Sequence, residues 1–555
     1  MRLRVVIFAV VAAALGWVAY AAADGASNSY LYVARYDHWT AADERAYGEF
    51  ITAIGDSQCR TVDSCLHGTW NPFAAGDPDS IYFRSDCADL PYVLRAYFAW
   101  KRSLPFSYEG DVEPRGPTRD FRYTRKGNEV TERKDVLTNS LTGYTLLEDV
   151  REAVSSASYR IDPDVETPAE PDMYSPAIDP KSIHPGTMVY DPNGHVVTIY
   201  RIFPNGRLEY FDAHPDDSVT RGFFDERFVR ARPSMGAGFK NWRPIRLVGA
   251  TRRADGALIG GHIEIAANKD IADFSVEQYF GNGKRPDDDS LWDEGGFSIN
   301  GQLFEYYDYV RAKIAGGKLE FDPVQEVRDM VDSNCNDLHY RGDAVNLAVA
   351  AGLDKHAEPE RLPINIYGTE GDWEIYSSPS RDARLKTSFK ELRDNVQRFV
   401  ELYRAHDSKI VYKGTDLPAD MLAAYDNRAG ACKLSYTKSD GTQVFMSYEE
   451  ARRRLFLMSF DPYQCVERRW GATDSRELAS CRDGGRKQEW YAAEQNLRNQ
   501  LDRTYDARMD FTLEELKSPG PGKGVASPPD IDARGYLQGI RNPRPVVMRT
   551  ASPPG

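Results

Sequence analysis

Residues 86–106 read DCADLPYVLRAYFAWKRSLPF, the pattern of a buried helix with a cysteine just ahead of it. The apolar side chains fall on one helical face, so we expect a helix over about residues 90–100, with Cys87 at or just before its start. Pro91 would clash with the preceding turn if the helix began at Cys87, which favours a start nearer Pro91. A helix N-terminus stabilises a thiolate, so this position predicts a cysteine of depressed pKa.

Residues 195–215, HVVTIYRIFPNGRLEYFDAHP, form the second informative stretch. The Asn-Gly dipeptide at residues 205–206 predicts a hairpin between two strands, the first of which opens with His195. If the turn has two residues, residue 216 faces His195. Because side chains alternate with period two, three residues of the return strand share the face of His195: Asp212, His214 and Asp216. Asp212 would need a bulge or a strong twist in the hairpin to reach His195. Geometry alone therefore leaves open which of the three residues orients the imidazole.

The first 23 residues have the features of a secretory signal peptide. Two arginines precede an apolar run over residues 5–18, and three alanines follow at 21–23. The run is shorter than the ~20 residues of a membrane-spanning helix, although an uncleaved N-terminal anchor is the alternative. We therefore expect an exported protein, periplasmic or extracellular, with no stable membrane span after cleavage.

The cysteine count is odd, and export makes this informative. Seven cysteines in an oxidising compartment predict three disulfides and one free thiol. Proximity in sequence pairs Cys59 with Cys65 and Cys465 with Cys481, and elimination pairs Cys335 with Cys432. The free thiol is then Cys87.

Composition excludes some classes of function. The 555 residues are 41% hydrophobic, enough for two or three cores. The 84 acidic residues exceed the 70 basic ones, giving a formal net charge of -14. A basic surface for nucleic acid is therefore not expected.

The periodicity of the chain predicts an α+β unit followed by a mostly helical one. Strand-rich sequence ends near residue 270, and helical periodicity begins beyond about Glu305. Capping-box spacing after Ser388 and Ser447 predicts helix starts there. The expected divisions are a signal peptide at 1–23, a catalytic unit at 24–300 with an insertion at about 109–180, a mostly helical domain of unknown role at 301–517, and a disordered Pro/Gly-rich tail at 518–555.

A thiolate nucleophile needs a base within hydrogen-bond reach and a group that orients the base, and His195 is the best placed of the nine histidines. A metal site is the rival use of these groups, but no HExxH or CxxC spacing is present. We therefore expect no metal, and chemistry on a thiolate nucleophile needs no cofactor. The four side chains weighed as metal ligands are His184, His195, Asp212 and His214.

These segments resemble the transglutaminase-like cysteine proteins, in which a Cys precedes a helix and a strand-opening His is followed by an Asp about one hairpin later. PGTMVYDPNGHVVTIY, residues 185–200, is also similar to a segment of NlpC-type cell-wall peptidases. Both families share a papain-like core. The resemblance implies that fold, with inserted segments, and assigns the three catalytic roles to Cys87, His195 and Asp212.

The implied activity is thiol acyl transfer on peptide or isopeptide bonds, by a hydrolase or acyltransferase. A peptide or protein is the expected substrate, with peptidoglycan as one candidate. Oxyanion donors would include the Cys87 backbone N–H and a side chain of Trp70 or Asn71. The alternative is a non-catalytic envelope scaffold or binding protein that keeps the fold without its chemistry.

Overall fold

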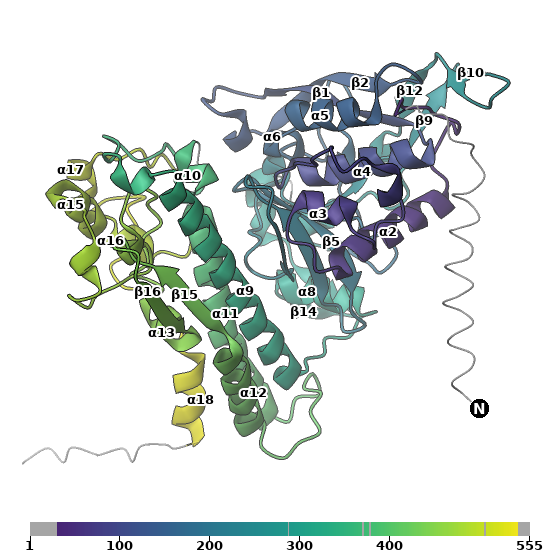
Figure 1. Ribbon diagram of the computed structural model, residues 1–555. Helices are drawn as coiled ribbons and strands as arrows, with labels where there is room; N and C mark the ends of the chain where they lie inside the picture. Colours follow the sequence, from purple (N-terminus) through teal and green to yellow (C-terminus); the bar gives the residue numbers. More distant parts are fainter. Residues whose placement is uncertain (1–29, 287, 369–370, 377–378, 504–506, 542–555) are drawn as a thin grey trace, which may run out of the picture.

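The computed structural model describes residues 30–286, 288–368, 371–376, 379–503 and 507–541. It contains a mixed α/β unit and a mainly helical second unit that lie side by side (Figure 1). The expected signal peptide lies outside the described residues. No helix in the described ranges is both long enough and apolar enough to cross a membrane.

A six-stranded antiparallel sheet forms the centre of the first unit, in the order β3-β8-β4-β5-β6-β7. Alternate residues of β5 enter different cores. Val196 and Tyr200 join the core on one face of the sheet, whereas Val197 and Ile199 join the core on the opposite face. The strands are β3 (Met173–Tyr174), β4 (Met188–Asp191), β5 (His195–Ile202), β6 (Leu208–Ala213), β7 (Val219–Phe223) and β8 (Gly238–Trp242).

Helices cover both faces of this sheet. The core on one face includes residues of α2 to α5, and α8 contributes to the core on the other. The helices of this unit are α2 (Ala41–Asp56), α3 (Val62–His67), α4 (Asp89–Arg102), α5 (Gly143–Ala153), α6 (Ser156–Tyr159), α7 (Glu277–Phe280) and α8 (Tyr306–Ile314).

Four two-stranded hairpins decorate the first unit, and the first of them falls largely within the expected insertion. They pair β1 (Phe106–Pro114) with β2 (Asn128–Val136), β9 (Ile245–Val248) with β12 (His262–Ile265), β10 (Thr251–Arg252) with β11 (Leu258–Ile259), and β13 (Phe297–Ile299) with β14 (Gln302–Phe304).

Helix α4 is almost entirely buried, and its start explains how Pro91 is tolerated. It begins at Asp89, so Pro91 lies in the first turn, where no intrahelical donor is needed. The Asp86 carboxylate accepts from the N–H groups of Ala88 (2.8 Å) and Asp89 (3.1 Å) and thus caps the helix. Cys87 therefore lies in the turn between the capping residue and the helix. Each large apolar side chain buried along α4 contributes roughly 1.5–3 kcal/mol.

The second unit packs three long helices and a small hairpin around its own core. A disulfide between Cys335 and Cys432 ties α9 to the end of α12. The elements are α9 (Pro323–Ala350), α10 (Asp372–Ile375), α11 (Pro379–Arg404), α12 (Leu417–Ala431), β15 (Lys433–Thr437), β16 (Gln443–Ser447), α13 (Tyr448–Arg454), α14 (Val466–Arg469), α15 (Gly485–Ala493), α16 (Gln495–Asn499), α17 (Leu513–Leu516) and α18 (Ala533–Arg541).

Short 3-10 helices complete the chain. They are η1 (Ala74–Gly76), η2 (Phe121–Tyr123), η3 (Pro233–Met235), η4 (Asn268–Asp270), η5 (Asp289–Glu294), η6 (Leu353–Lys355) and η7 (Leu478–Ser480).

Three features differ from expectation. The first unit extends past residue 300, because Tyr309 and Val310 of α8 bury their side chains on the sheet. The expected disordered tail contains α18, which contributes fully buried side chains to the second core. Helix α11 begins at Pro379, so Ser388 lies inside it and donates to the Leu385 carbonyl, whereas Ser447 does cap its helix.

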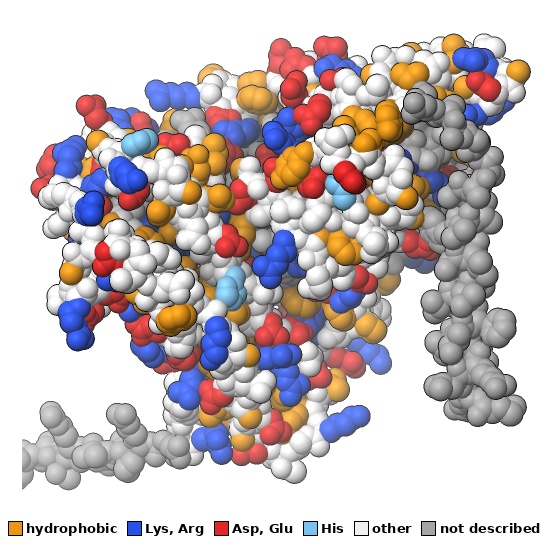
Figure 2. Space-filling view, in the orientation of Figure 1, with side chains coloured by type: hydrophobic (Ala, Val, Ile, Leu, Met, Phe, Trp, Pro, Cys, Tyr) orange, Lys and Arg blue, Asp and Glu red, His pale blue; other side chains and the backbone are white. Residues whose placement is uncertain are grey.

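Ion pairs join the two units across their interface. Buried Arg503 of the second unit binds Asp191 at the end of β4 in the first unit. In the second ion pair, Oδ2 of Asp337 on α9 lies 3.2 Å from Nη1 of Arg227 in the first unit. Figure 2 shows basic and acidic side chains interspersed over the visible face of both units. These contacts bring α9 and α11 to the region of the sheet where His195 lies.

Candidate active site

The cysteine pairing predicted from the sequence is confirmed. Disulfides join Cys59 to Cys65, Cys335 to Cys432 and Cys465 to Cys481, with S–S distances of 2.07, 2.03 and 2.10 Å. Cys87 is the single free cysteine and is partly buried. Three disulfides are consistent with an exported protein.

The Cys87 thiol lies against the backbone on either side of His195. It donates to the Gly194 carbonyl with an Sγ–O distance of 3.6 Å, and the backbone N–H of Val196 lies near enough to lower the thiol pKa against the larger effect of burial. Gly194 has a φ of 85°, and a Cβ there would lie only 3.2 Å from the Tyr123 hydroxyl. A glycine is therefore needed where the nucleophile candidate meets the strand.

His195 and Asp212 form a buried hydrogen-bonded pair. Nε2 of His195 lies 2.7 Å from Oδ2 of Asp212, and the two residues are 7% and 2% exposed. The other carboxylate oxygen accepts from the Thr220 hydroxyl at 2.5 Å. His214 Nε2 lies 3.4 Å from Asp212 Oδ2 and 3.0 Å from the Thr220 hydroxyl.

A shift in hairpin register explains why Asp212 reaches His195. Ile202 pairs with Leu208, which gives a turn longer than the expected two residues, and a further shift occurs between Ile199 and Arg201. These shifts displace β6 along β5, as the bulge expected from the sequence would, and bring Asp212 closer to the position opposite His195. Asp216 instead accepts hydrogen bonds from Ser218 in the turn that leads to β7.

The electrostatics describe a neutral thiol and a neutral imidazole. Burial raises the pKa of the Cys87 thiol well above its ordinary value, and the nearby Asp86 carboxylate adds to this increase. Burial and then the positive charge of Arg384 lower the pKa of His195, although Asp212 opposes them. The depressed thiol pKa expected from the helix terminus is therefore wrong for this conformation, because desolvation outweighs the helix dipole.

Asp212 remains ionised. Burial alone would raise its pKa, but the two histidines and the Thr220 hydroxyl hold it well below its ordinary value. An ionised carboxylate only accepts hydrogen bonds, so His195 carries its proton on Nε2. Within the described residues, no hydrogen bond joins Cys87 Sγ to the imidazole, and Nδ1 is left as the nitrogen that can accept a proton.

The oxyanion donors differ in part from expectation. The Trp70 indole N–H donates to the Cys65 carbonyl at 2.8 Å, and the Asn71 amide donates to the Leu66 carbonyl and the Tyr97 hydroxyl. Both side chains are thus committed elsewhere in this conformation. The backbone N–H of Cys87 makes no hydrogen bond with any described residue, so it can serve as a donor.

The second unit covers the His195–Asp212 pair. A cavity of about 40 Å³ is bounded by these two residues and by side chains of α9 and α11. The Tyr340 ring of α9 lies 4.2 Å from the ring of His214, centroid to centroid. Arg384 of α11 also lines the cavity. Sequence reasoning missed Tyr340 and Arg384, since no motif connects the second unit with the hairpin.

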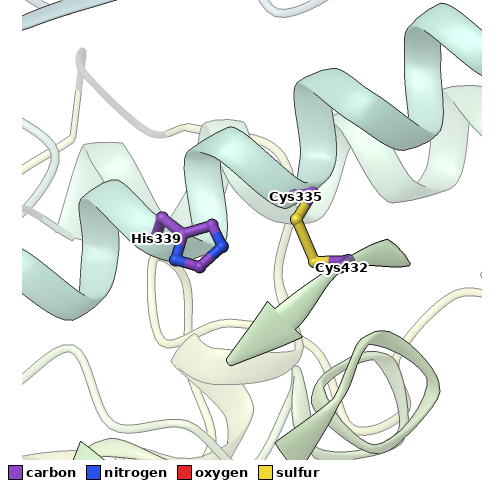
Figure 3. Close-up of side chains that lie close together, drawn as sticks. All are labelled: Cys335, His339 and Cys432. Atoms are coloured by element: carbon purple, nitrogen blue, oxygen red, sulfur yellow. A yellow bond between two sulfur atoms is a disulfide. The ribbon is translucent and has the colours of Figure 1, made fainter. Parts of the chain in front are cut away.

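Three of the four possible metal ligands, His195, Asp212 and His214, meet at this site, but His184 does not. His184 is exposed and its Nδ1 lies 3.0 Å from the Pro185 carbonyl. Elsewhere Cys335, His339 and Cys432 lie close together (Figure 3), but a disulfide occupies both sulfurs. The same holds for Cys465 and Cys481 beside Asp483. Neither group offers a thiolate while oxidised.

Comparisons of the chain with models of known protein families, with curated proteins and with solved structures find no match.

Proposed function

We propose that the protein is a papain-like thiol hydrolase or acyltransferase that acts on peptide or isopeptide bonds. The observation that carries the proposal is the position of Cys87. It is the one cysteine outside a disulfide, it precedes a buried helix, and it contacts the residues on both sides of a histidine that a buried carboxylate orients. A structural thiol has no need of this buried His–Asp partner.

The chemistry is a two-step acyl transfer. Nδ1 of His195 accepts the Cys87 proton as sulfur attacks the carbonyl carbon, and Asp212 stabilises the resulting imidazolium. The C–N bond then breaks, and the leaving nitrogen takes the proton from the imidazolium. Water or an amine attacks the thioester, the S–C bond breaks, and Cys87 regains its proton. In this proposal the Cys87 N–H donates to the oxyanion in both steps.

The resting geometry requires a rearrangement before this chemistry. The thiol and imidazole are neutral, and the thiol donates to the Gly194 carbonyl instead of to His195. In unliganded enzymes catalytic hydrogen bonds are often formed only when substrate binds. Substrate would therefore have to displace part of the cover over the histidine and bring Sγ to Nδ1.

A non-catalytic scaffold is the second candidate. The same partly buried, protonated thiol and the small cavity under α9 and α11 favour it. In that case the helical unit is the binding part, and the His195–Asp212 pair contributes only to the fold.

A product analysis distinguishes the two candidates. The oxidised protein is incubated with purified peptidoglycan and, separately, with a glutamine-containing protein and an added amine, and products are identified by mass spectrometry. We expect cleavage or amide exchange that is lost in Cys87→Ala, a change of small volume that leaves the disulfides intact. Products formed equally by the Cys87→Ala protein would contradict the proposal.

A further inference from the structure

The cavity above the His195–Asp212 pair is rich in cationic side chains. Four arginines line it, against two carboxylates, Asp212 and Asp337. Two histidines also line it, but burial lowers the pKa of both, so they do not add to the positive charge. Two of the arginines already bind carboxylates: Arg227 pairs with Asp337 at 3.2 Å, and Arg341 pairs with Asp382 at 2.9 Å. The balance of charge in the cavity suits an anion.

Arg384 has no carboxylate partner within the described part of the chain. Its side chain makes one hydrogen bond there, from Nη1 to the Ser380 hydroxyl at 2.9 Å, one helical turn away on α11. Burial and then the positive charge of Arg503 lower the pKa of the guanidinium, against the opposing effect of the Asp191 and Asp212 carboxylates. Most of the guanidinium donors are thus available to a ligand.

The charge of Arg384 acts on both reacting groups. It lowers the pKa of His195, and it lowers the pKa of the Cys87 thiol against the larger opposing effect of burial. Arg384 also lies in the second turn of a helix of 26 residues, near the end where the helix dipole is positive. Arg384 is therefore a cation of the second unit that acts on the thiol and the imidazole together.

We infer that Arg384 is a specificity-determining residue that binds a carboxylate of the substrate beside the scissile bond. The inference rests on the proposed function and assigns the helical unit a role in it, since α11 supplies a cation that has no carboxylate partner among the described residues. A carboxylate matches the planar guanidinium through two parallel hydrogen bonds. Its size also suits the cavity of about 40 Å³, room for roughly three waters. The expected substrate class is an acidic peptide or isopeptide.

Two alkylating reagents test this without a known substrate. Iodoacetate and iodoacetamide share a leaving group and differ in charge. The rate of Cys87 alkylation by iodoacetate, divided by the rate with iodoacetamide, is therefore independent of the thiolate fraction. The rate ratio of each folded protein is then divided by the rate ratio of the same protein unfolded in urea, which removes the intrinsic difference in reactivity between the two reagents. We expect the normalised ratio to fall roughly tenfold in Arg384→Gln and to be largely retained in Arg384→Lys. Arg476→Gln is the matched control, because that side chain is 92% exposed.

Competition identifies the anion. Acetate should slow iodoacetate labelling of the wild-type protein but not of Arg384→Gln. Protection by inorganic phosphate with none by acetate would overturn the assignment to a carboxylate. Thermal unfolding of each variant shows whether it is folded, and the Arg384→Lys protein keeps the comparison valid if the glutamine variant is not.

Failure of the inference is distinct from failure of the proposed function. If labelling depends on His195 but the ratio is the same in Arg384→Gln and wild type, the inference is wrong and the thiol chemistry stands. A parallel rise in both rates in Arg384→Gln would show that the residue only holds α11 over the thiol, and would also overturn it. No labelling of native Cys87 by either reagent would contradict both.

Discussion

His195 donates from Nε2 to Oδ2 of Asp212 across 2.7 Å, with both side chains buried. This contact fixes the tautomer and directs Nδ1 away from the carboxylate, as a general base for Cys87 requires. Replacing Asp212 with Asn removes the charge that stabilises the imidazolium. We expect acylation of Cys87 by p-nitrophenyl acetate, followed as released p-nitrophenolate, to slow by roughly 10²-fold or more.

Asp216→Asn is the matched control for that change. Asp216 shares the strand face expected of an orienting residue, but among the described residues its carboxylate accepts hydrogen bonds only from Ser218, in its own turn. Its acylation rate should stay near the wild-type rate. A slow Asp216→Asn protein beside an unaffected Asp212→Asn protein would contradict the assignment.

A second prediction concerns the charge beside the thiol. Asp86 raises the pKa of Cys87 and also caps α4 through its Oδ1. In Asp86→Asn an amide oxygen can still cap the helix while the negative charge is gone, so the thiolate is less disfavoured and the thiol pKa falls. Half-maximal alkylation by iodoacetamide should lie above the free-thiol value of about 8.5 in wild type and move to lower pH in the variant.

The Asp440→Asn protein, altered in the β15–β16 turn, should keep the wild-type profile. A half-maximum that stays in place, or rises, in Asp86→Asn would show that burial alone sets the thiol pKa.

The amphipathic pattern and the cysteine arithmetic predicted much of this site. Apolar spacing located α4, and an odd cysteine count identified Cys87, because both signals are local in sequence. The sequence also placed Asp212 and His195 on one face, but their contact depends on a register shift near Arg201 that no residue type specifies. Local patterns therefore identify the candidate site residues but do not predict the contacts between their side chains.

The covering helices could not be predicted from local patterns. Capping-box spacing at Ser388 predicts a helix start nearly three turns later than Pro379, which leaves Arg384 outside the expected helix. Likewise the domain boundary was placed too early, since α8 reads as part of a helical region although its apolar face covers the sheet. In each case tertiary packing decides, and single-sequence periodicity does not report it.

The disulfides should contribute unequally to stability. The Cys335–Cys432 bridge closes 97 residues and the Cys59–Cys65 bridge closes 6. In the chain-entropy model, replacing the first pair with serines costs about 4–5 kcal/mol and the second about 2 kcal/mol. Urea unfolding of the two double variants measures the difference. Equal losses of unfolding free energy would contradict the entropic account.

The buried ion pair between the units predicts a further asymmetry. Arg503→Ala leaves Asp191 buried without its cation and should lower the free energy of unfolding by about 3–5 kcal/mol. The double variant Arg503→Met with Asp191→Asn removes both charges and should lose less. Calorimetry compares the two proteins. An equal loss in the single and double variants would mean that the pair contributes by packing and not by charge.

The most direct test of the central claim is the identity of the group that p-nitrophenyl acetate acylates. We predict a stoichiometric burst of p-nitrophenolate in the native oxidised protein, with the acetyl group found on Cys87 by peptide mass spectrometry. The burst should disappear in Cys87→Ala and slow by roughly 10²–10⁴-fold in His195→Ala, the usual contribution of a general base. Acetylation of Cys87 at an unchanged rate in His195→Ala, or a burst that persists in Cys87→Ala, would contradict the account.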